Sequence, residues 1–141
     1  MPTSWSEYLE NKGVQMFSSG RITRNEPGLC DDINDSESVR LISCQHLAVF
    51  RCTGADAAEF LQGQFSCDIE RINDNHWATG AYCNPKGRVL AILRIARSVD
   101  AFLLIGEASV LPSIIKRLNI YVLRADVNFT LDADTAVLVY S

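Results

Sequence analysis

Three groups of polar residues lie within or beside apolar segments of this sequence, and each could contact a ligand. The first is Gln62, Gln64 and Asp68 in the string "FLQGQFSCDI", residues 60–69. Gly63 is unusual for a plain amphipathic helix, because glycine in a helix costs about 1 kcal/mol relative to alanine. Either the chain turns at Gly63, or another group approaches the backbone closely there.

Two interpretations of this string remain open. In the first, the two amides and Asp68 face a ligand. In the second, Gly63 ends a helix as the left-handed residue that follows its C-terminus, and the two amides are solvated.

The second group is Lys86 and Arg88 in "CNPKGRV", residues 83–89. Proline and glycine at these offsets suit a hairpin loop, with Gly87 free to adopt a positive φ. Both cations would then project from a tight turn whose backbone N–H groups can also bind an anion. The alternative is a hairpin tip with solvated charges. A phosphate loop is excluded, because the Gly-x-x-x-x-Gly-Lys pattern is absent.

The third group is Arg94 inside the apolar run "VLAILRIA". In a strand, Arg94 shares one face with Leu90 and Ile92, and the alternate residues share the other. A guanidinium on an apolar face needs an anionic partner or an exposed position. Asp68 or a ligand carboxylate could supply the partner. The alternative is an exposed outer face of a sheet.

Other chemistries find little support. No nucleophile accompanies His46 or His76, so a catalytic triad is not indicated. Trp77 is expected to pack in the core or against the sheet, and the alternative is a platform on which a ligand stacks. The five cysteines have irregular spacing and no Cys-x-x-Cys pair, which argues against a zinc site or a disulfide framework; they are expected to be reduced and mostly buried: Cys30, Cys44, Cys52, Cys67 and Cys83.

Composition narrows the class of protein. The 141 residues, of which 48% are hydrophobic, suffice for one globular domain or part of a larger protein. A net charge of −4 gives no bulk attraction to nucleic acid or to an anionic membrane. No apolar run reaches the roughly 18 residues of a membrane span, and the N-terminus lacks the apolar core of a signal peptide. We therefore expect a cytoplasmic protein with no membrane and no direct nucleic-acid partner.

The N-terminal part of the chain predicts few elements. A helix is expected over residues 3–13, followed by a structureless segment over residues 18–38, which lacks periodicity. Short strands are expected at residues 39–43 and 47–54. A helix over residues 53–62 would have Thr53 as its N-cap and three apolar residues on one face: Ala57, Phe60 and Leu61.

The remaining segments predict an antiparallel meander and a second helix. Two strands within residues 76–96 flank the hairpin loop, and a third follows at residues 101–106. Residues 110–119 have helical spacing, and Pro112 fits only a first turn; the residues expected on the buried face are Leu111, Ile114, Ile115 and Leu118. Further strands are expected within residues 121–131 and 135–141.

Together these elements predict an α+β fold, a mainly antiparallel sheet with helices packed on one face. The chain is expected to divide into an N-terminal helix and loop, residues 1–37, and a larger part, residues 38–141. Because it stops directly after the apolar run "AVLVY", we expect that the rest of a domain is missing. The exposed sheet edge could then pair with a second copy to form a dimer.

Three strings together resemble a known family. "GADAAEFLQGQFSCDIERI", "AYCNPKGRVLAILRI" and "DAFLLI" are similar, in order and separation, to the N-terminal part of the YgfZ-type folate-binding proteins. These are paralogues of the glycine-cleavage T-protein, an aminomethyltransferase. The resemblance is most specific from Gly54 to Arg94, and weaker from about Val39 to Ser141.

The resemblance implies a cytoplasmic protein that binds tetrahydrofolate and assists the assembly or repair of iron–sulfur enzymes, including a radical enzyme that thiolates tRNA. The family fold is a three-part ring around a folate-sized hole, and this chain would supply part of the first portion. Some bacterial members have a tryptophan lining the pocket where this sequence has Leu47. In the family, the Gln-Gly-Gln turn supports the site first and contacts the ligand second. The residues implied for cofactor binding are Leu47, Gln62, Gln64, Asp68, Lys86, Arg88 and Arg94.

Two departures from the family patterns restrict the chemistry. The T-protein has an acidic pair in the strand after its Gly-Gly turn, and an aspartate there orients the attacking folate nitrogen. Here the matching positions are Ala91 and Ile92, whose side chains cannot accept a proton. The Lys-Gly-Cys-(aromatic)-x-Gly-Gln motif of the family is also absent from this chain. Folate binding without aminomethyl transfer is therefore expected, with no catalytic residue and no metal ligand in this chain. The alternatives are a folate-dependent aminomethyltransferase, which Ala91 and Ile92 disfavour, and an isolated fold fragment without activity of its own.

Overall fold

The computed structural model describes residues 14–16, 22–24, 41–44, 46–73, 76–133, 135 and 137–140. The chain forms two compact units, one of residues 1–46 and 133–141 and the other of residues 47–132. The boundary expected after residue 37 falls outside the described residues and stays a prediction. The helix expected over residues 3–13 lies outside the described residues.

The first unit contains two short antiparallel strand pairs. Strand β1 (Val14–Met16) pairs with β2 (Ile22–Arg24), and β3 (Leu41–Ser43) pairs with β9 (Leu138–Tyr140). The strands expected near residues 39–43 and 135–141 are thus confirmed. The structureless interpretation of residues 18–38 is wrong at β2, because two β-branched residues there favour a strand and β1 supplies its hydrogen-bonding partner.

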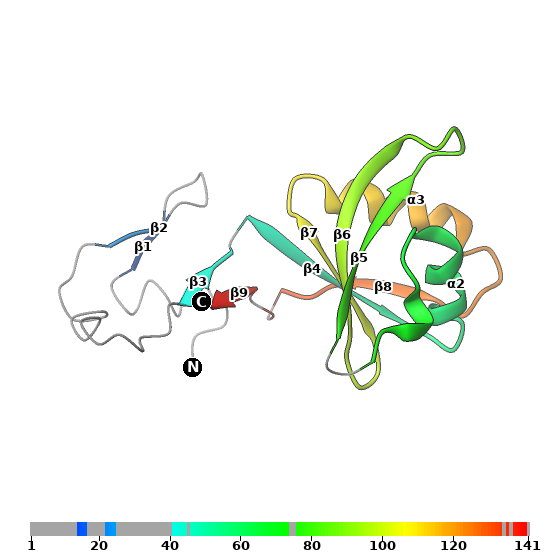
Figure 1. Ribbon diagram of the computed structural model, residues 1–141, viewed down its shortest axis with the longest axis horizontal. Coiled ribbons are helices and arrows are strands. Elements are labelled where there is room, and N and C mark those ends of the chain that lie inside the picture. The colour runs from blue at the N-terminus through cyan, green and yellow to red at the C-terminus, as the bar shows by residue number, and fades with distance from the viewer. Residues whose placement is uncertain are drawn as a thin grey trace. The chain divides into compact units, whose positions relative to one another are not determined.

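The second unit is built on a five-stranded antiparallel sheet with the strand order β5-β6-β7-β4-β8 (Figure 1). Its strands are β4 (Leu47–Thr53), β5 (Trp77–Cys83), β6 (Val89–Arg97), β7 (Phe102–Glu107) and β8 (Asn128–Leu131). The neighbours β5, β6 and β7 form the predicted meander. The non-local pairing of β4 with β7 and β8 completes the sheet.

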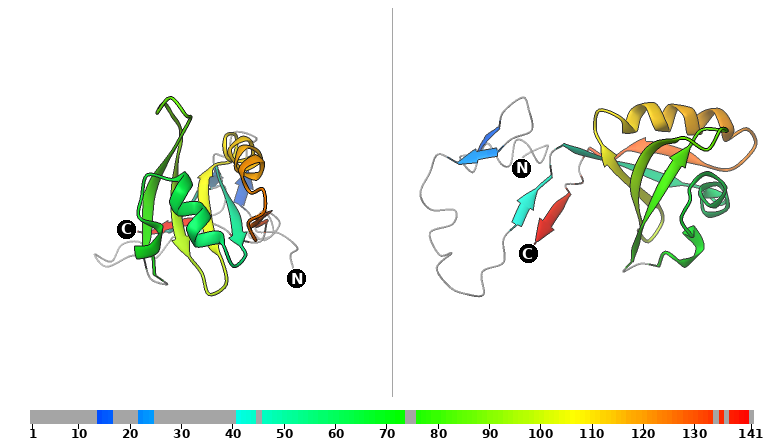
Figure 2. Two further views of the ribbon diagram at one scale, coloured as in Figure 1. Left: turned by 90° about the vertical axis from the view of Figure 1, so that its right-hand side faces the viewer. Right: turned by 45° about the horizontal axis from the view of Figure 1, so that its top comes forward.

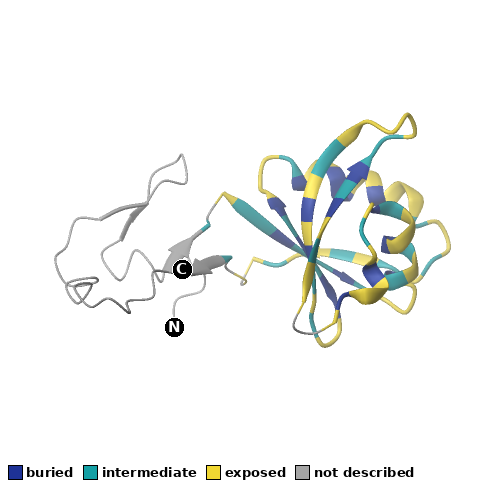
Figure 3. Cartoon of the chain, in the orientation of Figure 1, coloured by how far each residue is buried: buried dark blue, intermediate teal, exposed yellow. Residues whose placement is uncertain are grey.

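One face of this sheet, the inner face, packs against helices α2 (Ala57–Gln64) and α3 (Leu111–Tyr121) and the short 3-10 helix η1 (Ile69–Arg71) (Figure 2). A single hydrophobic cluster joins them to the sheet, and its buried positions alternate along the strands (Figure 3). The α+β prediction, with helices on one face, is confirmed. The predicted buried face of α3 is also confirmed, since these four residues are buried: Leu111, Ile114, Ile115 and Leu118.

Helix α2 begins later than predicted. Thr53 belongs to β4, and Gly54 follows it with φ +118°, so the chain turns sharply before the helix. A β-carbon at Gly54 would lie 2.0 Å from the carbonyl oxygen of Asp126, which explains the glycine. The N-cap is Asp56, whose carboxylate accepts a hydrogen bond from the backbone N–H of Asp126 at 2.8 Å instead of capping the helix.

The strand expected over residues 121–131 is confirmed only from Asn128 onward, as β8. Helix α3 continues to Tyr121, and a turn follows in which the N–H of Ala125 donates to the carbonyl of Val122 at 2.8 Å. Among the described helices, none combines the length and apolar content that would let it cross a bilayer.

Candidate functional site

The face of the sheet opposite the helices, the outer face, is the surface that gathers the candidate residues. Side chains alternate along each strand, so residues between the core positions point to this face. From the strand register the outer face comprises Leu47, Val49, Arg51, Thr53, Trp77, Thr79, Ala81, Ile92, Arg94, Ala96, Leu103, Ile105, Glu107, Asn128 and Thr130. Its apolar side chains lie mainly on β5, β6 and β7, and in the second unit neither helix packs on it, although Val49 on β4 is buried.

Arg94 lies near the middle of the outer face. It is opposite Thr79 on β5 and Ile105 on β7, and Ile105 is in turn opposite Val49 on β4. The guanidinium of Arg94 lies 5.7 Å from the centre of the Trp77 ring. No carboxylate forms an ion pair with Arg94 in the described part of the chain. Of the two alternatives for Arg94, the structure therefore shows the exposed position on an outer sheet face.

Trp77 does not pack in the core, so the prediction that it would was wrong. Its side chain is 61% exposed, and Ile92 on the neighbouring strand is 66% exposed. The reason is strand parity: the buried Tyr82 fixes the inner face of β5, and Trp77 lies an odd number of positions away. Sequence reasoning therefore missed an indole and a cation that lie against each other on an uncovered apolar face.

The second arginine of the outer face, Arg51, is neutralised. It pairs with Asp100 at 2.7 Å and with Asp132 at 3.5 Å, and the Asp132 side chain is nearly buried. Asp132 also donates its backbone N–H to Val49 at 2.9 Å. Arg51 thus ties β4 to the segments that follow β6 and β8, whereas Arg94 keeps its charge available.

Leu47 begins β4 on the same outer face and is half-buried opposite Glu107. Strand β7 separates it from the β6 strand that holds Arg94. Of the seven predicted residues, only Leu47 and Arg94 share this face.

Gln62, Gln64 and Asp68 lie at the junction between α2 and η1. The Gln62 carbonyl oxygen accepts a hydrogen bond from the backbone N–H of Ile69 at 2.7 Å. This contact holds the start of η1 against α2, and the predicted support of a ligand site stays a prediction. Asp68 pairs with Arg71 at 3.1 Å, so it is not the partner of Arg94 that the sequence left open.

Gly63 is neither a turn residue nor a point of close approach. Helix α2 continues through it to Gln64, and its φ is not positive. A β-carbon at Gly63 would meet no atom within 4 Å. The helix instead ends at the extended Phe65, whose N–H donates to Leu61 at 3.1 Å. The predicted left-handed helix end was therefore wrong.

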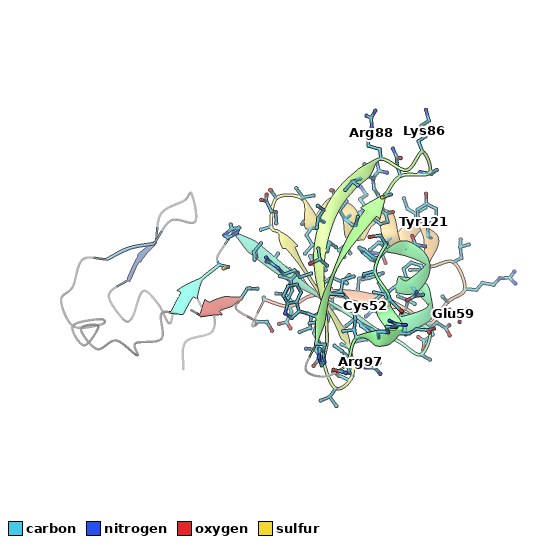
Figure 4. All side chains as sticks on the ribbon, viewed as in Figure 1. Cys52, Glu59, Lys86, Arg88, Arg97 and Tyr121 are labelled. Carbon is cyan, nitrogen blue, oxygen red and sulfur yellow. The ribbon has the colours of Figure 1, made fainter. Side chains whose placement is uncertain are left out.

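Lys86 and Arg88 occupy the tip of the β5–β6 hairpin, where both side chains are exposed and point away from the sheet (Figure 4). The side-chain oxygen of Asn84 accepts hydrogen bonds from the N–H groups of Lys86 at 3.0 Å and Arg88 at 2.9 Å. Gly87 has φ +77°, as predicted. The tip is thus an ordered loop with two free cations, distant along β6 from Arg94.

The described cysteines form no joint site. Cys44, Cys52, Cys67 and Cys83 are free thiols, and only Cys52 is fully buried, so the expectation of mostly buried cysteines was wrong for these four. Burial raises the pKa of the Cys52 thiol to about 12 and also raises the pKa of Cys67. Within the described ranges no group of three or more possible metal ligands occurs.

A cavity of about 190 Å³ opens where β4, the start of α2 and the β6–β7 turn meet. Arg97 lies at its rim, with its guanidinium 5.4 Å from the centre of the Phe102 ring, and Cys52 contributes to its lining. None of the seven predicted residues lines this cavity.

This chain is similar in sequence to several known proteins, but each match covers only part of the known protein. No family model matches the chain. An uncharacterized protein of Haemophilus influenzae is 33% identical over 93 residues, which cover 65% of this chain and 33% of that protein. The tRNA-modifying proteins YgfZ of Sodalis glossinidius and of an Enterobacter species are each 30% identical over 98 residues, which cover 70% of this chain and 30% of theirs. The chain spans about a third of the length of these relatives.

A solved structure is similar in fold. The glycine cleavage system aminomethyltransferase T from Bartonella henselae superposes with a TM-score of 0.64 over 73% of this chain and 28% of its own chain, at 16% identity. At this identity the likeness concerns the fold alone. The predicted T-protein-like fold is confirmed.

Proposed function

From the confirmed resemblance of this chain to YgfZ-type proteins, we propose that it supplies one wall of a tetrahydrofolate site, and that this wall is the outer face of its sheet. The proposed parent protein is a cytoplasmic accessory factor for the assembly or repair of iron–sulfur enzymes, including enzymes that modify tRNA. The words "tRNA-modifying" in the relatives' names support the last point.

The observation that carries the folate assignment is the stack of Arg94 on the exposed Trp77. A folate has flat rings at one end and carboxylates at the other. Flat rings gain from an exposed indole and from apolar side chains such as Ile92. A guanidinium without an acidic partner suits a carboxylate, because such pairs are charge-assisted and often bidentate. Leu47 extends the same face toward the other end of β4.

The residues beside Arg94 support binding rather than group transfer. Ile92 is exposed on the outer face, and Ala91 is half-buried on the inner face. These are the positions where the resemblance to the T-protein implies an acidic pair. An aliphatic side chain at the surface can contact a folate ring but cannot accept a hydrogen bond from the folate nitrogen. We therefore propose a folate-binding role without aminomethyl transfer.

The test is calorimetric titration of tetrahydrofolate, under reducing conditions, into the chain and two pairs of variants. We expect saturable binding that Trp77→Ala and Arg94→Gln each weaken by about tenfold or more. Arg97→Gln and Phe102→Leu are matched controls, because Arg97 and Phe102 form the equivalent stack away from the outer face; their affinities should stay at the wild-type value. The same titrations are made with the full-length parent, and equal affinity in wild type and Arg94→Gln, or no binding by either the chain or the parent, would contradict the assignment.

A second assay separates binding from catalysis. The chain is mixed with an aminomethyl-lipoyl carrier protein and tetrahydrofolate, and the formation of methylene-tetrahydrofolate is followed. We expect none above the uncatalysed rate, since Ala91 and Ile92 replace the acidic pair. Turnover would instead favour a true aminomethyltransferase.

A further inference from the structure

The C-terminal end of α3 exposes three large side chains within four positions. Ile120 is 66% exposed, Tyr121 is 52% exposed and Leu123 is 89% exposed. We name these three residues the α3-end patch. They follow the last buried residue of α3, Leu118, and Tyr121 continues its helix face beyond the covered part of the helix. Figure 4 shows the Tyr121 side chain standing out from the ribbon.

Leu123 is also strained. Its φ of +45° is the left-handed conformation, and it is the one residue other than glycine with a positive φ among the described positions. Glycine or asparagine usually occupies this place after a helix, because a β-carbon there crowds the backbone. Leucine neither relieves the strain nor gains burial in this chain. A strained residue without a local benefit points to a role outside the fold.

Cations surround the α3-end patch. Lys116, Arg117 and Arg124 lie within its helix and the turn after it, and no ion pair involves them in the described part of the chain. Arg117 and Tyr121 are one helical turn apart, on the same side of α3. Both also lie close to Tyr82. Burial raises the pKa of the Tyr82 hydroxyl, Tyr121 raises this pKa further, and Arg117 lowers it. An arginine, an exposed tyrosine and aliphatic side chains thus share one small surface.

We propose that the α3-end patch is a docking surface for a partner protein that presents an apolar side chain flanked by carboxylates. Tyrosine and arginine are the residue types that dominate binding energy at protein interfaces. The free cations provide the charge complementarity that would select an acidic partner. This surface is separate from the outer face, so the proposal does not depend on folate binding.

Other occupants fit less well. Ile120 and Leu123 would contribute no binding energy against the phosphate backbone of RNA, which argues against RNA as the partner. The apolar face of a membrane-lying helix runs along its length, whereas that face of α3 is buried and only its end is apolar and exposed. A two-fold contact between copies of the chain would bring its cations together, which is unfavourable.

The test uses the full chain and a random peptide library displayed on phage. Peptides are selected on the immobilised wild-type chain, synthesised, and titrated by fluorescence anisotropy into wild type and variants. We expect selected peptides to combine apolar residues with aspartate or glutamate. Leu123→Gly and Tyr121→Ala should each weaken their binding by about tenfold or more. Val99→Ala is the matched control, because Val99 is 97% exposed elsewhere on the chain.

Thermal unfolding of Leu123→Gly completes the test. We expect an unchanged or higher midpoint, since glycine relieves the strained φ. A clearly lower midpoint would show that Leu123 serves the fold, and would overturn the proposal. Selected peptides without acidic residues, or with equal affinity for all variants, would overturn it too. The proposal would also be overturned if polyuridine RNA or phosphatidylglycerol vesicles bound the wild type but not Leu123→Gly.

Discussion

The two faces of the five-stranded sheet differ in what covers them, although the same strands form both. On the inner face, Leu93, Ile95 and Leu104 are no more than 2% exposed beneath the helices. On the outer face, Ile92 and Trp77 are more than half exposed. A step of one residue along β6 therefore separates side chains that hold the fold from side chains that are available to a ligand.

The two arginine–aromatic stacks show the same contrast between a covered and an exposed face. Arg97 covers the ring of Phe102, which is 5% exposed and belongs to the core cluster. Arg94 covers Trp77, which contributes to no described core. The first stack shields a core residue from water, whereas the second leaves an aromatic surface and a charge exposed. Similar local geometry thus has a different consequence on each face.

The largest expected effect is on stability, from truncating an inner-face residue. Leu104→Ala should lower the free energy of unfolding by about 3 kcal/mol, because it removes a fully buried side chain and leaves a cavity. Leu103→Ala, one position away on the outer face, should cost about 1 kcal/mol or less. Urea denaturation measures both. Equal losses would break the distinction between the faces.

A smaller effect is expected from two glycines in different settings. A β-carbon at Gly80 on the inner face would lie 2.7 Å from the Cys67 sulfur and 3.3 Å from the Phe65 β-carbon. Gly80→Ala should therefore destabilise the chain by about 1–3 kcal/mol. Gly63→Ala should stabilise it by about 1 kcal/mol, because Gly63 is helical with open space around it. Thermal unfolding checks both signs, and a destabilised Gly63→Ala would restore a special role for that glycine.

The next effect depends on pH and reports the burial of the inner face. The Cys52 thiol has a pKa of about 12 in the folded state, above the ordinary value of 9.0. As the pH rises above 9, the Cys52 thiol loses its proton in the unfolded state but keeps it in the folded state. This deprotonation stabilises the unfolded state, so the free energy of unfolding falls. Wild type should lose up to about 1.4 kcal/mol per pH unit more than Cys52→Ala between these two pKa values. Parallel pH profiles of the two proteins would show that Cys52 is not shielded from water.

The smallest expected effect on stability comes from the outer-face stack. Arg94→Gln should change the free energy of unfolding by less than about 1 kcal/mol, because an exposed cation–π contact contributes no more than that. The same variant is expected to lose tetrahydrofolate binding in calorimetry. A large loss of stability in urea denaturation would show that the stack serves the fold instead.

Local patterns predicted some parts of the molecule well. The buried stripe of α3 follows from helical spacing, and the hairpin loop with Gly87 follows from turn chemistry. The meander follows from three strand-like runs with short connections. By contrast, the end of α2 was predicted at Gly63, because glycine commonly ends helices. The structure lets the helix pass through it and ends at Phe65, which pairs with Tyr82 in an isolated bridge.

The sequence by itself determined most of the element types, the α+β class and the family resemblance, and it restricted Arg94 to a paired or an exposed position. These rest on periodicity, turn residues and motif order, all of which are local in the chain. Only the tertiary structure decided that Trp77 is exposed to solvent beside Arg94 and that Leu47 lies on the same face of the sheet. Those facts depend on which side of the sheet the helices cover and on pairing β4 with β7, between residues far apart in sequence. An alternating strand pattern marks two faces, but the packing of distant segments selects which one is buried.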